Sequence, residues 1–482
     1  MHSKIVKNYL YNLSYQVLVL LTPLITTPYI SRTLGAKGVG IYSYRYSIVA
    51  YFSIFAALGM QIYGQLRLAA VREKKEEFSK LFFQILITKL ITAALSITAY
   101  YSYVLLLVTE NKDIALVLGL NIAATFLDIS WFLQSIEEFK RTAIRNYIVK
   151  ICSLILIFCF VKDENDVLIY ALILQGSVFV GNISLWIGIK KYLVPVRIES
   201  LEVKNHLLQS LAYFVPTLAS TLYSYFDKTM IGFFSSTVQN GFYEQAYKLE
   251  NVSITIVSSL SIVIMPRIAF LYGSKNKGEI DRILKKTSRT MIFLAAPIAA
   301  GLFSISNTLI PWFLGEEFLP SIPLLKMFSF ILLIDVIKDF YGTQILIPTK
   351  HQREYNIATV LGTLVNITFN YLLIRRFYAL GACVASVISE VFVIVLFAII
   401  CKEMLPFTKI MLSGWKYFFA SIIMGIIVHC MGTLRWNHTA LIVIQIMVGI
   451  LSYVSLLLIL QDSLVKEIKK QVLTNRRRTK DT

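Results

Sequence analysis

Residues 439–461 read TALIVIQIMVGILSYVSLLLILQ, a long run without a single charged side chain. A helix rises about 1.5 Å per residue, so about 20 apolar residues cross the roughly 30 Å hydrocarbon core of a bilayer. The run is continuously apolar, whereas a strand of a membrane β-barrel would alternate between apolar and polar residues. We therefore predict that this segment crosses a membrane as an α-helix.

Working outward from this run, we find that most of the chain has the same character. Hydrophobic residues make up 56% of the sequence, only 16% are charged and the mean hydropathy is +0.67. This composition excludes an ordinary soluble domain. We predict an all-α polytopic membrane protein with about 14 transmembrane helices. The predicted spans are residues 9–31, 39–62, 81–105, 114–136, 146–161, 167–189, 207–233, 242–270, 290–312, 324–347, 355–374, 379–401, 415–431 and 439–461.

The distribution of Lys and Arg between the spans predicts the topology. With the N-terminus inside, the inner segments contain 34 of these residues, the outer loops contain 8, and 5 lie within spans. Positive charge in short loops marks the cytoplasmic side. We therefore predict a multi-pass membrane protein with both termini in the cytoplasm.

The net charge of +19 has the same explanation. Basic inner loops and the basic tail at 462–482 orient the protein and contact anionic lipids, so we expect no nucleic-acid partner. The sequence has no nucleotide-binding Gly-rich loop and no metal-ligand motif, and the outer loops are short. We therefore expect a transporter rather than an enzyme, without a metal or another cofactor.

Two parts of the chain resemble each other. Residues 38–42 (GVGIY) correspond to 239–243 (QNGFY) at an offset of 201, and 77–81 (EFSKL) correspond to 279–283 at an offset of 202. Both matches fall at the same place in a six-span unit. An even number of spans makes the two copies like-oriented, which is the arrangement of parallel transporter repeats around a central cleft. The predicted parts are a bundle at 1–190, a bundle at 205–401, two added helices within 415–461, and the tail at 462–482.

Four basic residues within predicted spans are our candidates for a cationic substrate cavity. An ionisable group in a span is costly, so it usually faces a water-filled cavity or another charge. Arg45 lies deep in the second span, and no acidic residue is within four positions of it. Its counterpart in the second copy is Ala246, two residues before Lys248, so both copies have a cation near this depth. Two such cations suit an anionic substrate; Lys228 and Lys89 are the other candidates.

Acidic residues in the spans are candidates for charge pairing or for ion coupling. Those that we single out are Asp128, Asp227, Glu244 and Asp335; Glu250, Asp339 and Glu390 are further intramembrane acids. Glu244 and Lys248 are four residues apart on one helical face, and Lys338 follows Asp335 by three residues. Such pairs can neutralise each other within a helix and serve structure alone. Both interpretations stay open.

The chain also resembles a known family. Two six-helix bundles with two added helices, together with residues 30–44 (ISRTLGAKGVGIYSY) and 226–232 (FDKTMIG), are similar to bacterial polysaccharide-transport (Wzx-type) flippases. These belong to the multidrug/oligosaccharidyl-lipid/polysaccharide exporter superfamily. The resemblance implies translocation of an undecaprenyl-diphosphate-linked oligosaccharide repeat unit from the inner to the outer leaflet, by alternating access driven by an ion gradient. It also implies glycosyltransferases and a polysaccharide polymerase as functional partners.

Three alternatives remain at this point. A drug/cation antiporter of the same superfamily is expected to have a cavity dominated by acidic groups, and a peptidoglycan-precursor flippase would share the fold. A membrane glycosyltransferase or polysaccharide polymerase would need catalytic residues on a sizeable outer loop. The short outer loops disfavour such an enzyme.

Overall fold

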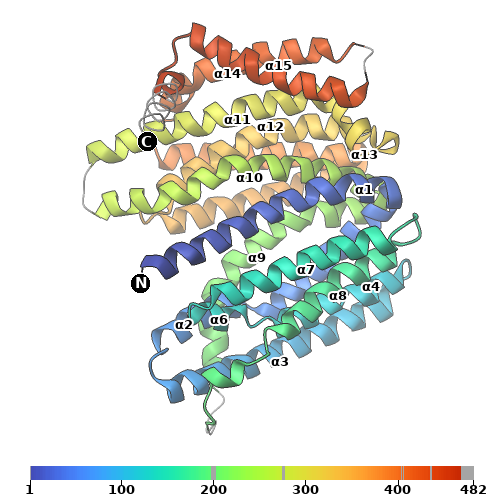
Figure 1. Ribbon diagram of the computed structural model, residues 1–482, viewed down its shortest axis with the longest axis vertical. Helices are drawn as coiled ribbons and strands as arrows, with labels where there is room; N and C mark the ends of the chain where they lie inside the picture. The colour runs from blue at the N-terminus through green and yellow to red at the C-terminus, as the bar shows by residue number, and fades with distance from the viewer. Residues whose placement is uncertain are drawn as a thin grey trace, which may run out of the picture. The chain divides into compact units, whose positions relative to one another are not determined.

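The computed structural model describes residues 2–196, 202–273, 277–402, 404, 406–434 and 437–467. These residues form helices and connecting turns, and no β-strand occurs among them (Figure 1). This confirms the predicted all-α fold. Contacts between residues divide the chain into two compact units, Met1–Glu244 (unit 1) and Gln245–Thr482 (unit 2).

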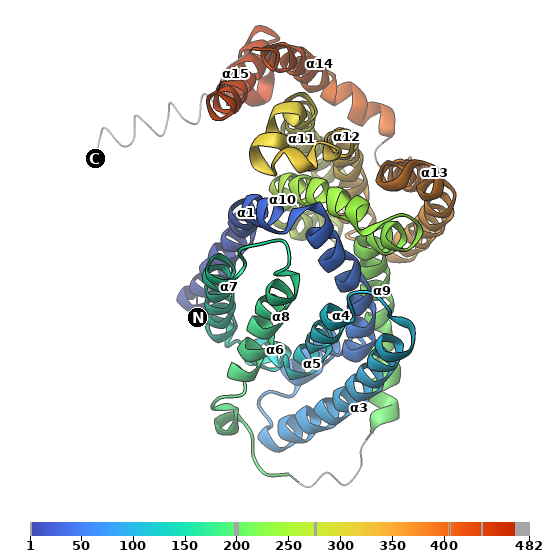
Figure 2. The ribbon, with the colours of Figure 1, turned by 90° about the vertical axis from the view of Figure 1, so that its right-hand side faces the viewer.

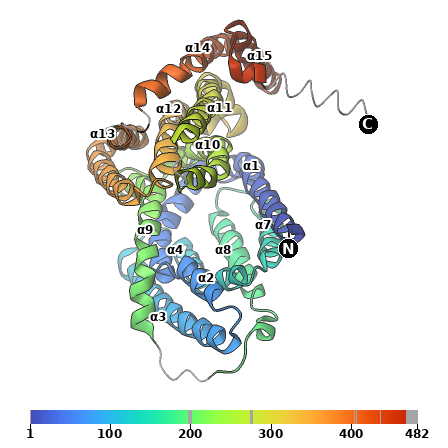
Figure 3. The same cartoon turned by 90° about the vertical axis from the view of Figure 1, so that its left-hand side faces the viewer.

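Unit 1 contains nine α-helices, the beginning of a tenth and a short 3-10 helix (Ile189–Tyr192) among its described residues. The α-helices are α1 (His2–Ala57), α2 (Met60–Ala70), α3 (Lys75–Leu107), α4 (Lys112–Leu118), α5 (Leu120–Leu127), α6 (Ser130–Ser135), α7 (Phe139–Phe160), α8 (Val167–Ser184), α9 (Val203–Phe234) and the start of α10 (Thr237–Gly273). In Figure 2, α1, α7 and α8 lie beside one another, as their contacts require. The helix α9 packs along α1 and α3 (Figure 3).

The two ends of unit 1 differ in chemistry. Residues near the predicted inner ends of the spans form an apolar cluster around the buried Trp131. Met60 and Leu185 belong to this cluster, and so does Phe78 of the inner loop. Segments predicted to be external meet around a polar cavity of about 280 Å³, which Lys37, Asn111, Asp113 and Glu164 line. The predicted inner and outer loops of this unit therefore gather separately.

Two long helices each contain two of the predicted spans. In α1 the backbone leaves the helical region at Gly35, where φ is 65°, and the chain turns back so that α2 lies at the same end of unit 1 as the N-terminus (Figure 1). In α13 (Gln352–Ile400) the break is at Tyr378, where φ is 53°. Ten of the described helices are long and apolar enough to cross a membrane. Because α1 and α13 each hold two spans, and the more polar α9 and α12 fall outside the ten, this result is compatible with about 14 spans.

Unit 2 is built around α11 (Lys277–Phe313). Its neighbours in contact are α12 (Ser321–Asp339), α14 (Phe407–Met431) and α15 (His438–Ile459), and α12 also contacts α13. The helix α12 continues as a π-helix over Phe340–Leu346. The buried core of this unit contains side chains from all of these helices, including Leu332, Phe397 and Met424.

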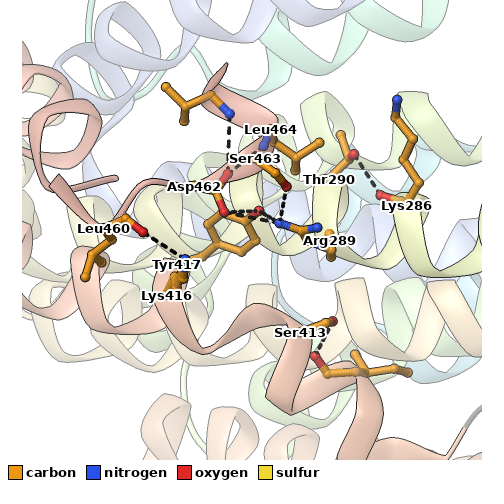
Figure 4. Close-up of polar contacts among 12 residues, drawn as sticks. Lys286, Arg289, Thr290, Ser413, Lys416, Tyr417, Leu460, Asp462, Ser463 and Leu464 are labelled. Carbon is orange, nitrogen blue, oxygen red and sulfur yellow. Dashed lines mark hydrogen bonds and ion pairs between the residues drawn. The ribbon is translucent and has the colours of Figure 1, made fainter. Parts of the chain in front are cut away.

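The two added helices are fixed to α11 by a polar cluster (Figure 4). Asp462, whose side chain is 1% exposed, accepts hydrogen bonds from Tyr417 Oη at 3.1 Å and from Arg289 Nη2 at 3.2 Å. Arg289 also donates to Ser463 Oγ at 3.0 Å. The start of the predicted tail is thus anchored to unit 2, whereas Arg476, Arg477 and Arg478 lie outside the described residues.

Two predicted spans differ in detail from the observed helices. The segment 114–136 is broken at Gly119 into α4 and α5 and at Asp128 into α5 and α6. At the second break the Asp128 backbone is extended and its carboxylate accepts a hydrogen bond from Ser130 N. The segment 146–161 is part of a longer helix that begins at Phe139. The grouping of 1–190 and 205–401 into two like-oriented bundles stays a prediction.

Candidate functional site

The kink in α1 packs against the turn between α9 and α10 through a reciprocal contact. A Cβ atom on Gly40 would lie 1.6 Å from the carbonyl oxygen of Thr237, and one on Gly241 would lie 2.0 Å from that of Ala36. At the offset of 201, Thr237 corresponds to Ala36 and Gly241 to Gly40. Each copy of the repeat therefore presents the same two positions to the other, as in a two-fold interface.

Beside this contact lies a buried ion pair. Lys228 Nζ is 2.7 Å from Glu244 Oε2, and the two side chains are 8% and 12% exposed. Glu244 also accepts a hydrogen bond from Ser43 Oγ at 3.0 Å, and Ser43 is its counterpart in the repeat. The neighbouring Asp227 accepts from Tyr243 Oη at 2.7 Å. Both charged residues of α9 are thus engaged with α10 at the predicted outer end.

A second intramembrane cluster surrounds the break between α5 and α6. Lys89 is 1% exposed and donates to the backbone carbonyl oxygen of Asp128 at 2.7 Å. The Asp128 carboxylate lies 3.8 Å from Arg145 Nη2. The carbonyl oxygen that accepts from Lys89 belongs to Asp128, where the helix is broken and this oxygen lacks a helical hydrogen bond. Lys89 supplies the missing donor.

The other two predicted cations lie elsewhere. Arg45 is half-buried on α1, and its Nη2 donates to the carbonyl oxygen of Glu110, in the loop before α4, at 2.6 Å. Its guanidinium also lies 5.2 Å from the centre of the Tyr44 ring. Lys248 is half-buried on α10, within unit 2. The proposed clamp of Arg45 with Lys248 therefore stays a prediction.

In unit 2, α12 and α13 bring three charged residues together. Lys338 Nζ lies 2.8 Å from Asp335 Oδ1 on its own helix and 2.6 Å from Glu390 Oε2 on α13. The sequence indicated the Asp335–Lys338 pair from its spacing, but it did not group Glu390 with it. One signal was available, since Asp335 and Glu390 are each at the middle of a predicted span and therefore at one depth.

Comparison with known families gives a match over more than half of the chain. The model of the polysaccharide biosynthesis protein family matches residues 5–271. A putative O-antigen transporter of Escherichia coli (strain K12) is 21% identical over 375 residues, 77% of this chain and 90% of that protein. The capsular polysaccharide biosynthesis protein CapF of Staphylococcus aureus is 26% identical over 406 residues, 80% of this chain and 96% of that protein.

Two solved structures share the fold. The lipid II flippase MurJ, in an inward closed conformation, matches 95% of this chain and 100% of its own with a TM-score of 0.74 and 14% identity. An inward-facing multidrug resistance MATE family transporter matches 80% of this chain and 98% of its own with a TM-score of 0.60 and 13% identity. At these identities the likeness concerns the fold alone.

Proposed function

We propose that this chain, which belongs to the polysaccharide biosynthesis protein family, is a flippase for lipid-linked oligosaccharides. One observation carries the proposal: the chain is similar, over 90% of that protein's length, to a protein named a putative O-antigen transporter. A further relative, 22% identical over 62% of this chain, is named a probable low-salt glycan biosynthesis flippase, Agl15 of Haloferax volcanii. The substrate class is an undecaprenyl-diphosphate-linked oligosaccharide, moved from the inner to the outer leaflet of the bacterial cell membrane without chemical change.

The reciprocal glycine contact supports alternating access as the mechanism. Two like-oriented repeats can rock about their common axis, and a contact that uses the same positions of both copies opens or closes as one unit. Gly40 and Gly241 have no Cβ atom, so the backbones of α1 and α10 meet directly at this contact, which we call the junction. The closed junction excludes a substrate from the outer side. Opening must separate Ser43 from Glu244, which are 3.0 Å apart in this conformation. An ion gradient supplies the energy for this cycle in our proposal.

Of the four predicted cations, Arg45 and Lys248 remain our candidates for contacts with the diphosphate. Lys228 and Lys89 each bind a protein group within unit 1, and Arg45 Nη2 binds the Glu110 carbonyl oxygen, so contacts with protein groups do not rank the four. The Arg45 guanidinium keeps one buried nitrogen, Nε, without a hydrogen-bond partner among the described residues. A diphosphate oxygen could accept from it, with the geometry that makes Arg a preferred phosphate ligand.

The function is tested by disrupting the gene in cells that make a surface polysaccharide. We expect loss of the surface polymer and accumulation of its lipid-linked repeat unit on the cytoplasmic leaflet, while the glycosyltransferases that build the unit remain active. The polymerase would then lack its substrate. Normal surface polymer in the disrupted strain would contradict the proposal.

The role of Arg45 is tested by substitution. We expect Arg45→Ala to abolish export at unchanged protein abundance and Arg45→Lys to restore only part, because a point charge replaces a two-pronged donor. Arg375→Ala is a matched control at another arginine, outside the candidate cavity. Normal export with Arg45→Ala would remove this residue from the substrate site.

A second candidate function is a drug/cation antiporter. It is favoured by the excess of acidic over basic groups around Lys338 in unit 2. Efflux of a cationic dye from cells that overproduce the protein would support it, whereas rescue of surface polysaccharide in the disrupted strain supports the flippase. A peptidoglycan-precursor flippase would instead restore growth to cells that lack their own.

The predicted topology is tested by cysteine labelling with an impermeant reagent. We expect cysteines at Lys112 and Glu316 to react from outside and a cysteine at Thr482 to react only in opened cells. The opposite pattern would reverse the orientation.

A further inference from the structure

Lys338 is shared by two carboxylates in the interior of unit 2. Its Nζ lies 2.8 Å from Asp335 Oδ1 and 2.6 Å from Glu390 Oε2, and the Glu390 side chain is 2% exposed. Both carboxylates belong to the middle of predicted spans. A single positive charge therefore faces two negative charges within predicted spans, where a low dielectric strengthens the interactions between charges.

A third carboxyl group faces the same lysine from α10. Glu250 is 3% exposed, and its Oε1 is buried with no hydrogen-bond partner among the described residues. The charged groups that act on it are Asp335 and Lys338 from α12 and Glu390 from α13. Glu250 lies eight residues into the predicted span 242–270, about 12 Å from its outer end at 1.5 Å per residue.

The charges of these four residues do not balance. With all three carboxyls ionised, the group of Glu250, Asp335, Lys338 and Glu390 has a net charge of −2, and one bound proton reduces it to −1. A buried ionised carboxylate without a partner costs several kcal/mol, and neighbouring carboxylates disfavour ionisation of one another. Asp335 and Glu390 share the ammonium group of Lys338, so Glu250 is the carboxyl group whose negative charge would be compensated least.

Two further titratable groups border the cluster, and neither contributes a positive charge. Asp339 accepts a hydrogen bond from Ser261 Oγ of α10 at 2.6 Å. Tyr355, on α13, lies close enough to Lys338, Asp339 and Glu390 to interact with their charges. Neither group removes the deficit of positive charge at Glu250.

We propose that Glu250 is a proton-exchange site, and that binding and release of its proton couples an ion gradient to the movement of this transporter. Protonation forms one O–H bond on the carboxylate, with the proton taken from water on one side of the membrane. Release returns the proton to water on the other side, and no other covalent bond changes. Lys338 already occupies the position between Asp335 and Glu390 that a metal cation would take, which favours a proton over sodium. The coupling role rests on the proposed function, whereas the proton site itself does not.

The helix α12, which carries Asp335 and Lys338, has an irregular segment next to the cluster. Directly after Asp339, α12 continues as a π-helix, a rare form that often marks functional segments. Gln344 of this π-helix donates to the carbonyl oxygen of Ser261 on α10 at 3.0 Å. The helix that carries Glu250 is thus tied at a second point to the irregular part of α12. A change of charge at Glu250 acts on a contact between two helices that can repack.

Infrared spectroscopy of the full chain in nanodiscs tests the proton site directly. Near neutral pH we expect the wild-type protein to show the carbonyl stretch of a protonated, buried carboxylic acid, and Glu250→Gln to lose it. Glu244→Gln is the matched control, because this carboxylate on the same helix is balanced by Lys228. We expect the band to remain in that variant. Persistence of the band in Glu250→Gln would overturn the proposal.

Two other results would also overturn it. Gln has the shape of the protonated acid, so Glu250→Gln should fold; a variant that cannot be purified folded would mean that the charged form is required. A band that disappears on replacing KCl by NaCl at constant pH would assign the site to sodium.

The coupling role has its own readout. We expect Glu250→Gln to lose export of the surface polysaccharide in cells at normal protein abundance. Normal export with the infrared band gone would reject the coupling role and leave the proton site in place. A wild-type protein that fails to support export would reject the proposed function without changing the infrared result.

Discussion

Lys228 in unit 1 and Lys338 in unit 2 are both lysines within predicted spans, but they differ in the number of carboxylates that they face. Lys228 Nζ lies 2.7 Å from Glu244, and Glu244 has a hydroxyl donor in Ser43. Lys338 contacts both Asp335 and Glu390, and Glu250 interacts with the same group. The Lys228–Glu244 pair (the balanced site) has one charge of each sign, whereas the group of Glu250, Asp335, Lys338 and Glu390 (the unbalanced site) has three acidic residues and one base. Both sites contain a buried ion pair, so the ion pair itself does not distinguish them. The balance of charge does: the Lys228–Glu244 pair is suited to hold a conformation, whereas the group around Lys338 is suited to exchange an ion.

The largest expected effect comes from removing the cation of the unbalanced site. Lys338→Met leaves Asp335 and Glu390 buried without their common partner. Loss of one partner of a buried pair costs about 3–5 kcal/mol. We expect low abundance in the membrane and a strongly lowered melting temperature in detergent. The control is Lys285→Ala, at an exposed lysine of α11, which should match the wild type. A Lys338→Met protein of normal stability would mean that the carboxylates around it are already protonated.

A smaller effect is expected at the balanced site. Lys228→Met removes the partner of one carboxylate, Glu244, rather than of two, so we expect a loss at the lower end of the range of about 3–5 kcal/mol for a buried pair. The double variant Lys228→Met with Glu244→Gln should recover most of the melting temperature, because no charge is left without a partner. The corresponding double variant Lys338→Met with Glu390→Gln should recover less, since Asp335 still lacks its cation.

These double variants test the comparison itself. Equal recovery at the two sites would mean that the clusters are electrically equivalent, and the assignment of ion exchange to unit 2 would lose its basis. The measurement is the same for all variants, the melting temperature of the purified protein in one detergent.

The third prediction concerns the junction next to the balanced site. Gly40→Ala places a Cβ atom 1.6 Å from the Thr237 carbonyl oxygen, so the junction cannot close without a backbone shift. A Ser43→Cys substitution serves as the reporter. We expect its thiol to react several-fold faster with an impermeant maleimide in the Gly40→Ala protein than in the protein that keeps Gly40. Gly176→Ala is the matched control, because a Cβ atom there meets nothing within 4 Å. An unchanged rate in Gly40→Ala would contradict closure of the outer side at this contact.

The sequence predicted the class of fold, the approximate spans and several of the buried charges, because span length and loop charge are local properties. It also indicated the offset of 201, at which position 36 contacts the counterpart of position 40, position 40 contacts the counterpart of position 36, and Ser43 contacts its own counterpart, Glu244. The spacing of residues indicated the Asp335–Lys338 pair, but it did not predict partners on other helices. The i, i+4 spacing of Glu244 and Lys248 left a pair within one helix open, whereas the structure places Lys228, on another helix, 2.7 Å from Glu244. Glu250 and Glu390 were not grouped with Lys338, because contacts between helices leave no mark in the spacing of residues along one helix.

The smallest effect is expected at the aqueous end of unit 1, where His206 immediately precedes the predicted span 207–233. Its Nδ1 is hydrogen-bonded to Tyr63 Oη at 2.8 Å, and its Nε2 is buried with no partner among the described residues. Burial lowers the pKa of His206 below its ordinary value of about 6.5, although Glu202 acts in the opposite direction. Below this ordinary value the unfolded chain binds a proton that the folded protein does not yet accept, so stability is present above about pH 6.5 and falls as the pH drops below it.

His206→Gln removes this titration while keeping a side chain that can form a hydrogen bond with Tyr63. Between pH 7.5 and 5.5 we expect the melting temperature of the wild type to fall more than that of the variant, by a difference on the order of 1 °C. The effect is small because the negative charge of Glu202 offsets part of the effect of burial on the pKa of His206. An identical pH dependence in the two proteins would remove His206 from the groups that set stability. A difference as large as that caused by Lys338→Met would show that a charge at this aqueous end costs as much as one in the bilayer, against the comparison drawn here between sites.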